Sequence, residues 1–282
     1  MSTIEDYVKR LQIEGWCVID GVIPKSDVEK VRDSLLATAN QQSEEPQSRQ
    51  ESTGGRQAVL GLIAHDQTIA PYLSDERMMG ITEAFFGKYV RISMTTGIIL
   101  NPGYPRSDSN GGGLHADWPF GQGYDFSIPA PYANAPLLLT SIWMLTPFTR
   151  NNGATIVVPG SHKAENNPTG DSRLVPGQTH PSEIQAEGEP GSVLLFDSRI
   201  WHINGANNSD QDRIAVVARY AAWWFNLNPL IPGLSDYETD AAQRGIRPND
   251  VGPLTPEIYD TLPERTKPLF KHIVIGQQVL PS

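Results

Sequence analysis

The stretch Gly191-Ser-Val-Leu-Leu-Phe-Asp-Ser-Arg-Ile-Trp-His202 decides the fold class of this chain. Residues 192–196 form a short apolar run of the kind found in strands, and residues that favour a turn follow it. A second short segment then ends on a histidine. The stretch therefore predicts two β-strands joined by a turn, with the second strand delivering His202.

Similar runs recur along the chain beyond residue 90, separated by Gly, Pro and Asn. They cover residues 90–100, 137–146, 154–158, 192–196 and 214–222. Parallel βαβ units would require helical patterns between the runs, and this half of the sequence has none. We therefore expect a mainly β fold with flanking helices, either an antiparallel sandwich or a jelly roll.

The residues before 90 predict helices around one short strand. Apolar residues recur at helical spacing in residues 4–15, after Pro24 and again in residues 74–86. Residues 38–57 are polar, which predicts a surface loop, with a lid as the alternative. We expect a single domain in which residues 1–90 support a core at 91–225, and residues 226–282 form an irregular extension with a helix around 256–262.

Charge and cysteine content restrict the partners. The formal net charge of -10 works against binding a phosphate backbone, and the single cysteine, Cys17, excludes an internal disulfide or a thiolate metal cluster. The first residues lack the layout of a secretory signal, and no apolar run approaches the roughly 20 residues of a membrane span. We expect a cytoplasmic monomer or homodimer that binds a small molecule, and neither nucleic acid nor membrane.

A candidate metal motif lies in Leu114-His115-Ala116-Asp117-Trp118. Alternate residues of an extended chain face the same way, so His115 and Asp117 can reach one ion. An imidazole with a carboxylate suits a borderline divalent metal such as iron(II). The H-x-D pattern alone is weak, because a surface histidine beside an acid gives the same letters.

Two later residues strengthen the motif. His202 ends the stretch quoted above, and Arg213 follows it by eleven residues at the start of the next β-prone run. Four ordered matches make chance a weak explanation. A zinc hydrolase could use the same three ligands, but it would leave Arg213 without a purpose.

These motifs resemble those of the phytanoyl-CoA dioxygenase family of iron- and 2-oxoglutarate-dependent oxygenases. The resemblance covers about residues 13–225 and includes the segments 152–162 and 208–209. It implies a double-stranded β-helix, which is a cupin-like jelly roll with the metal inside its wider mouth. It also implies iron(II), 2-oxoglutarate and O₂ as the cofactor and co-substrates.

The resemblance assigns roles to matching positions. It implies that His115, Asp117 and His202 bind the iron, that Arg213 pairs with the distal carboxylate of 2-oxoglutarate, and that Trp143 lines the co-substrate pocket. Several relatives carry a glutamine three residues before the first histidine, where this chain has Gly112. The second co-substrate contact therefore stays open. Thr95 and Ser209 are candidates by polarity alone.

The expected reaction is hydroxylation of a C–H bond in a small metabolite or natural product, with release of succinate and CO₂. Related halogenases replace the carboxylate ligand by a small residue, so Asp117 favours oxygen transfer. Trp118 and Phe120 directly follow the ligands and are the candidate substrate contacts. Desaturation, epoxidation, rearrangement and stereoinversion at the same iron remain alternatives, as does a jelly-roll binding protein without catalysis.

Overall fold

The computed structural model of the chain describes most of its length. The described residues are 2–44, 51–53, 55–106, 113–117, 136–164, 179–225, 227, 235, 238–239 and 252–276. Within them, no helix is both long and apolar enough to cross a lipid bilayer. The helices are α1 (Ile4–Ile13), α2 (Lys25–Glu44), α3 (Ala70–Leu73), α4 (Glu76–Phe86), α6 (Pro256–Thr261) and α7 (Lys267–Phe270), with short 3-10 turns at Leu62–Ala64, Ser161–Lys163 and Lys271–Ile273.

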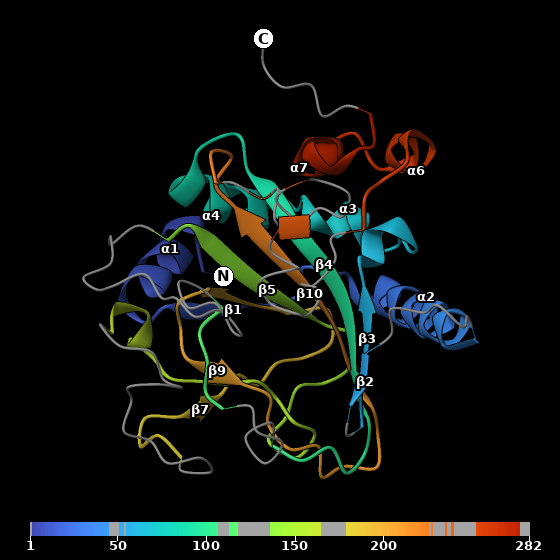
Figure 1. The fold of residues 1–282 in the computed structure, drawn as a ribbon. Helices are drawn as coiled ribbons and strands as arrows, with labels where there is room; N and C mark the ends of the chain where they lie inside the picture. The colour runs from blue at the N-terminus through green and yellow to red at the C-terminus, as the bar shows by residue number, and fades with distance from the viewer. Residues whose placement is uncertain are drawn as a thin grey trace.

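The strands form two antiparallel sheets. The larger sheet has the order β1-β8-β5-β10-β4-β3-β2 and the smaller one the order β7-β6-β9. Figure 1 shows the smaller sheet on one side of the larger, with helices on the other. The strands are β1 (Trp16–Ile19), β2 (Glu51–Thr53), β3 (Arg56–Leu60), β4 (Arg91–Leu100), β5 (Leu138–Met144), β6 (Ile156–Val157), β7 (Ile184–Gln185), β8 (Val193–Asp197), β9 (His202–Ile203) and β10 (Arg213–Ala221).

The central strand β10 divides its residues between two cores. Successive side chains of a strand point to opposite faces. Val216 and Ala218 pack into the core beneath the helices, whereas Ala215 and Val217 pack into a second core between the two sheets. Arg213 and Arg219 share the parity of this second group, so both belong to the inner face of the larger sheet.

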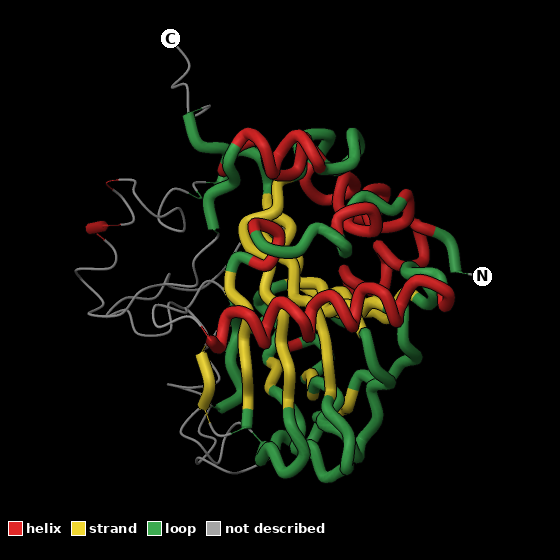
Figure 2. The backbone as a smooth tube through the Cα atoms, turned by 90° about the vertical axis from the view of Figure 1, so that its right-hand side faces the viewer, coloured by secondary structure: helices red, strands yellow, loops and turns green. Residues whose placement is uncertain are grey.

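A helical layer covers the outer face of the larger sheet. Figure 2 shows α2 lying across the strands. Its Leu35 is fully buried above β4, at the point where β4 carries Gly97. A Cβ atom at Gly97 would overlap the Leu35 side chain, so this glycine serves close helix–sheet packing.

The expected jelly-roll class is confirmed, as are the helices in the residues before 90 and the one that begins at Pro256. The surface loop expected at residues 38–57 is wrong in its described part. There α2 continues to Glu44, and β2 and β3 form a hairpin from Glu51 to Leu60. Pairing between β3 and β4 extends the larger sheet with this segment, which polarity alone had assigned to a loop.

Candidate metal centre and active site

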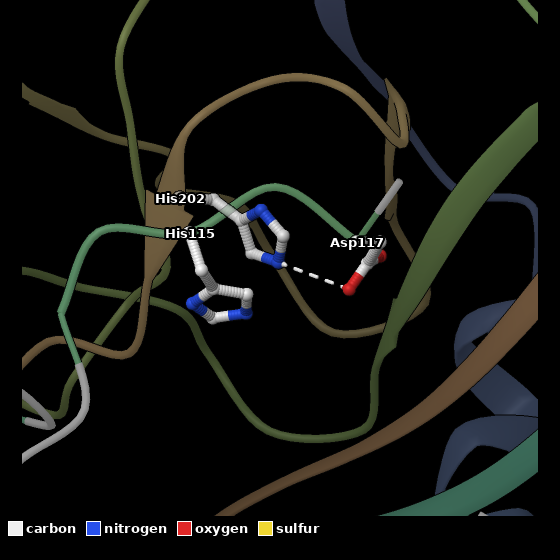
Figure 3. A group of neighbouring side chains, drawn as sticks. All are labelled: His115, Asp117 and His202. Carbon is white, nitrogen blue, oxygen red and sulfur yellow. Dashed lines mark ion pairs between the residues drawn. The ribbon is translucent and has the colours of Figure 1, made fainter. Parts of the chain in front are cut away.

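Three predicted ligands meet between the two sheets. One donor atom from each of His115, Asp117 and His202 lies within 4.8 Å of the other two. Figure 3 shows the three side chains pointing toward one another, with His202 at the start of β9 and the other two on the segment that runs beside it. Two imidazoles and a carboxylate with this spacing can hold one divalent ion.

The turn before His202 is fixed by a buried ion pair. The Arg199 guanidinium donates to the Asp197 carboxylate, with Nε–Oδ1 at 3.0 Å and Nη2–Oδ2 at 2.6 Å. The backbone N–H of Arg199 also donates to Asp197 Oδ1 at 2.9 Å. The sequence Asp-Ser-Arg therefore closes the turn between β8 and β9 with its own side chains, and the chain leaves the turn toward His202.

Backbone carbonyls orient both imidazoles. Nδ1 of His115 lies 3.1 Å from the Gly113 carbonyl oxygen, and Nδ1 of His202 lies 3.0 Å from that of Ile200. Because a carbonyl oxygen only accepts, each Nδ1 carries the proton and each Nε2 keeps its lone pair. Burial, and then the neighbouring His202, lowers the pKa of His115 to about 4, so this imidazole is neutral at pH 7. Neutral imidazoles are the form that binds a metal.

Asp117 is ionised and held from one side. Burial alone would raise its pKa, but Arg219, the two histidines and Thr140 together bring the pKa well below its usual range. Nη2 of Arg219 lies 3.0 Å from Oδ2 of Asp117, and the Thr140 hydroxyl donates to the same oxygen at 2.7 Å. The other oxygen, Oδ1, faces Nε2 of His202 at 3.8 Å.

Arg213 is a buried cation bound to neutral groups. Arg213 is only 1% exposed to solvent. Its Nη1 donates to the Gly153 carbonyl at 3.0 Å. Nη2 donates to the Asn204 side chain at 3.2 Å, and the guanidinium lies over the Phe148 ring. Within the described part of the chain, no carboxylate pairs with it, and its Nε has no hydrogen-bond partner.

The electrostatic setting of Arg213 follows from this burial. Burial, and then the nearby Arg56, lowers the pKa of Arg213 to about 9. The guanidinium is nevertheless the charged form at pH 7, in a place where an uncompensated charge costs several kcal/mol, on the order of the penalty for one buried ion. A buried cation with a free N–H is a site for an anion.

Two expected co-substrate contacts lie on the wrong face of the sheet. Trp143 is opposite Val216, packs in the core beneath the helices and donates its indole N–H to Ser141 Oγ at 2.9 Å. Thr95 is opposite Ala218, and its hydroxyl accepts from the Ile63 N–H at 3.1 Å. The expectations that Trp143 lines the co-substrate pocket and that Thr95 contacts the co-substrate are therefore corrected.

The other predicted site residues divide into two groups. Ser209 lies in the turn between β9 and β10. Its hydroxyl donates to the Asn207 side chain at 2.6 Å, so contacts within the turn already use the hydroxyl proton. Trp118, Phe120 and Gly112 fall outside the described residues. The two aromatic residues therefore stay predictions.

Three inner-face residues escaped the sequence interpretation. Arg219 contacts Asp117, Thr140 lies opposite Arg219 on β5, and Thr96 lies opposite Val217 on β4. The Thr96 hydroxyl is buried and has no hydrogen-bond partner among the described residues. For Arg219 a signal existed, since a position six residues after Arg213 on one strand shares its face. Thr140 and Thr96 required the strand register.

A jelly roll with two imidazoles, one carboxylate and a buried arginine on the next strand of the chain is the arrangement of a non-haem iron dioxygenase that depends on 2-oxoglutarate. The chain belongs to the phytanoyl-CoA dioxygenase (PhyH) family, whose model matches residues 11–215. The iron(II) and 2-oxoglutarate expected from the sequence are thereby confirmed as the cofactor and co-substrate.

Individual relatives agree with this family. Dioxygenase af480 of Aspergillus fumigatus is 27% identical over 228 residues, which are 78% of this chain and 67% of the relative. Among solved structures, HygX from Streptomyces hygroscopicus with nickel, 2-oxoglutarate and hygromycin B superposes with a TM-score of 0.58 at 16% identity, over 78% of this chain and 88% of HygX. The epimerase SnoN superposes with a TM-score of 0.54 at 20% identity, over 78% of this chain and 83% of SnoN.

Proposed function

We propose that this enzyme hydroxylates a C–H bond of a small metabolite or natural product at an iron held by His115, Asp117 and His202. In the proposal, Arg213 binds the distal carboxylate of 2-oxoglutarate, and succinate and CO₂ leave as co-products. The observation that carries the proposal is the buried guanidinium of Arg213, which has no carboxylate partner among the described residues. It lies on the same face of the sheet as Arg219, which pairs with the metal-ligand candidate Asp117.

The donor set fits iron(II) on observations of this chain. Both Nε2 lone pairs are free because both Nδ1 atoms face carbonyls. The carboxylate is ionised, and its Oδ1 lies on the His202 side. Two imidazoles and one carboxylate form the facial arrangement of non-haem iron oxygenases, which leaves positions on the ion for co-substrate and O₂.

The surroundings of Arg213 fit a dicarboxylate. Arg213 offers a free Nε–H, and Arg56 on β3 adds positive potential from two strands away. A planar guanidinium can pair with both oxygens of a carboxylate, which a lysine ammonium cannot do. Binding of the anion would also compensate the buried charge of Arg213, so it would stabilise the folded protein.

Thr96 takes the place that sequence reasoning gave to Thr95. It lies on the inner face, beside the stretch of β10 between Arg213 and Arg219, and its hydroxyl has no partner within the described chain. An unpaired buried hydroxyl costs free energy unless a ligand satisfies it. We therefore assign Thr96 as a second contact of 2-oxoglutarate.

Each residue has a limited task in the reaction. Iron and 2-oxoglutarate, when bound, supply the oxidising chemistry. Arg213 and Thr96 orient the co-substrate, and the apolar side chains of the inner core, such as Ile142 and Val217, exclude water from the space between the sheets. His115 and His202 serve as metal ligands and transfer no proton in the reaction.

The substrate class rests on charge and on the relatives. The net charge of -10 disfavours a polyanionic coenzyme-A thioester, although a local basic pocket is compatible with an acidic protein. HygX was solved with hygromycin B and SnoN with nogalamycin RO, which are small molecules of natural origin. A small, partly apolar natural product is the class that we propose.

Co-substrate binding tests the site. Under anaerobic conditions, iron(II) with 2-oxoglutarate should give a visible charge-transfer absorption, and titration gives the affinity. Arg213→Leu should weaken 2-oxoglutarate binding by about 30-fold or more, which corresponds to the loss of roughly 2 kcal/mol or more for one partner of a buried charge pair. Leucine also removes the buried charge, so the variant should fold. Unchanged affinity in Arg213→Leu would refute the assigned role.

A matched pair of threonine variants tests the second contact. Thr96→Val should lower 2-oxoglutarate affinity by roughly 2- to 10-fold, the effect of one hydrogen bond, without loss of stability. Thr95→Val should leave the affinity unchanged and lower stability, because it removes the acceptor of the Ile63 N–H. The reverse pattern would assign the contact to Thr95.

Stereoinversion is the alternative that one comparison favours, since SnoN is described as an epimerase. Product mass separates the reactions. Hydroxylation adds one oxygen atom, desaturation removes two hydrogens, and stereoinversion leaves the mass unchanged while changing the retention time of the product.

A further inference from the structure

The hydrogen bonds around Asp117 distinguish its two oxygens. Oδ2 forms an ion pair with Nη2 of Arg219 at 3.0 Å and accepts a hydrogen bond from the Thr140 hydroxyl at 2.7 Å. Oδ1 has neither contact and lies on the side of His202. With a guanidinium and a hydroxyl against Oδ2, the carboxylate has one oxygen left for a metal.

Arg219 and Thr140 hold each other in place. Arg219 and Thr140 lie directly opposite on β10 and β5, and Nε of Arg219 donates to the Thr140 hydroxyl at 3.4 Å. The Thr140 and Ser198 hydroxyls are also hydrogen-bonded, at 2.8 Å. Because the Thr140 proton goes to Asp117, this hydroxyl accepts from Ser198 and Arg219. The backbone N–H of Asp117 donates to the Ser198 carbonyl at 2.8 Å, which fixes the main chain as well.

We propose that Arg219 is a positioning residue that, together with Thr140, restricts Asp117 to binding the metal through Oδ1 alone. The inference rests on the proposed metal site. A six-coordinate ion bound by two imidazoles and one carboxylate oxygen keeps three further positions, which 2-oxoglutarate and O₂ need. A carboxylate that bound through both oxygens would occupy one of the three, and O₂ would have no place once 2-oxoglutarate had bound.

The buried environment makes this control necessary. A carboxylate readily binds a divalent ion through one or both oxygens. The Asp117 and Arg219 side chains are only 14% and 16% exposed, so solvent provides little competition for Oδ2. The guanidinium of Arg219 competes with the metal for Oδ2 as a cation 3.0 Å from that oxygen.

The number of water molecules on bound Mn²⁺ tests the inference without any turnover. Mn²⁺ has the octahedral preference needed here, and electron–nuclear double resonance in ¹⁷O-labelled water counts its water ligands. The wild-type protein should show three. Arg219→Met should show two, because Oδ2 keeps only the Thr140 hydroxyl and can then also bind the ion, and 2-oxoglutarate should displace both waters.

The controls separate the possible failures. Arg106→Met removes an arginine of similar exposure that pairs with Glu183, and it should keep three waters. Arg219→Gln, whose side chain is too short to reach Oδ2, replaces Arg219→Met if that variant does not fold. Three waters in the Arg219 variants would overturn the inference, and so would four, which would mean that Asp117 had left the ion. Failure of the wild-type protein to bind Mn²⁺ would instead overturn the proposed metal site.

Discussion

His115 and His202 exchange both of their backbone hydrogen bonds. The N–H of His115 donates to the His202 carbonyl at 3.1 Å, and the N–H of His202 donates to the His115 carbonyl at 2.9 Å. Residues paired in this way face the same side of an antiparallel ladder. Their imidazole centroids lie 4.3 Å apart, so the backbone alone brings together two ligands that are distant in sequence.

Replacing Trp143 should affect stability and leave the co-substrate unaffected. Trp143→Phe removes the hydrogen bond from the indole N–H to Ser141 Oγ and leaves a void beneath the helices. We expect the free energy of unfolding to fall by about 1–3 kcal/mol. Urea unfolding and a 2-oxoglutarate titration measure the two effects. A marked loss of 2-oxoglutarate affinity at unchanged stability would mean that Trp143 lines the co-substrate pocket after all.

The contact between Gly97 and Leu35 should give non-additive variants. Gly97→Ala should destabilise the protein by about 1–3 kcal/mol, because the new methyl group overlaps Leu35. Leu35→Ala should cost about 2–5 kcal/mol through the cavity that it leaves. The double variant should lose less than the sum, since the cavity accommodates the methyl group. Additive losses in urea unfolding would contradict the close approach of α2.

His272 should make the protein less stable in mild acid. Both of its ring nitrogens are buried and have no partner among the described residues. Burial, and then Arg91, lowers its pKa to about 3, below the roughly 6.5 of an unfolded chain. Between these values the unfolded chain takes up a proton that the folded chain does not. The free energy of unfolding therefore falls as pH falls through this window, and His272 has no such effect above it.

The variant His272→Gln isolates this contribution. Its free energy of unfolding should depend less steeply on pH between about 3 and 6.5 than that of the wild-type protein. Urea unfolding at several pH values measures the slope. His65→Gln, at an exposed histidine, is the matched comparison. Equal slopes for the wild-type protein and His272→Gln would exclude His272 as the source.

The sequence was sufficient for most strands beyond residue 90 and for the metal-ligand candidates, but it missed β2, β3 and β7. Runs of strand-forming residues between turn residues predict where strands lie, and the ordered spacing of His115, Asp117, His202 and Arg213 indicates the family. The structure brings the three metal-ligand candidates together. These features are local, or depend on spacing along the chain.

The sequence does not predict to which face of the sheet a side chain points, because the central strands are covered on both sides. In β4, nearly every residue is buried, so polarity does not alternate along it. Thr95 and Thr96 are therefore equivalent in the sequence, and only pairing with β10 distinguishes them. The same holds for Trp143 in the fully buried β5. At residues 38–44, polar composition concealed the continuation of a helix.

The position of two cations on one strand has a consequence for their spacing. Arg213 and Arg219 both belong to β10, so the length of a continuous covalent segment sets the distance from the proposed anion site to the cation that pairs with Asp117. The segments that connect the strands play no part in this distance. Changes in those connections can therefore leave the spacing of the two cations unaltered.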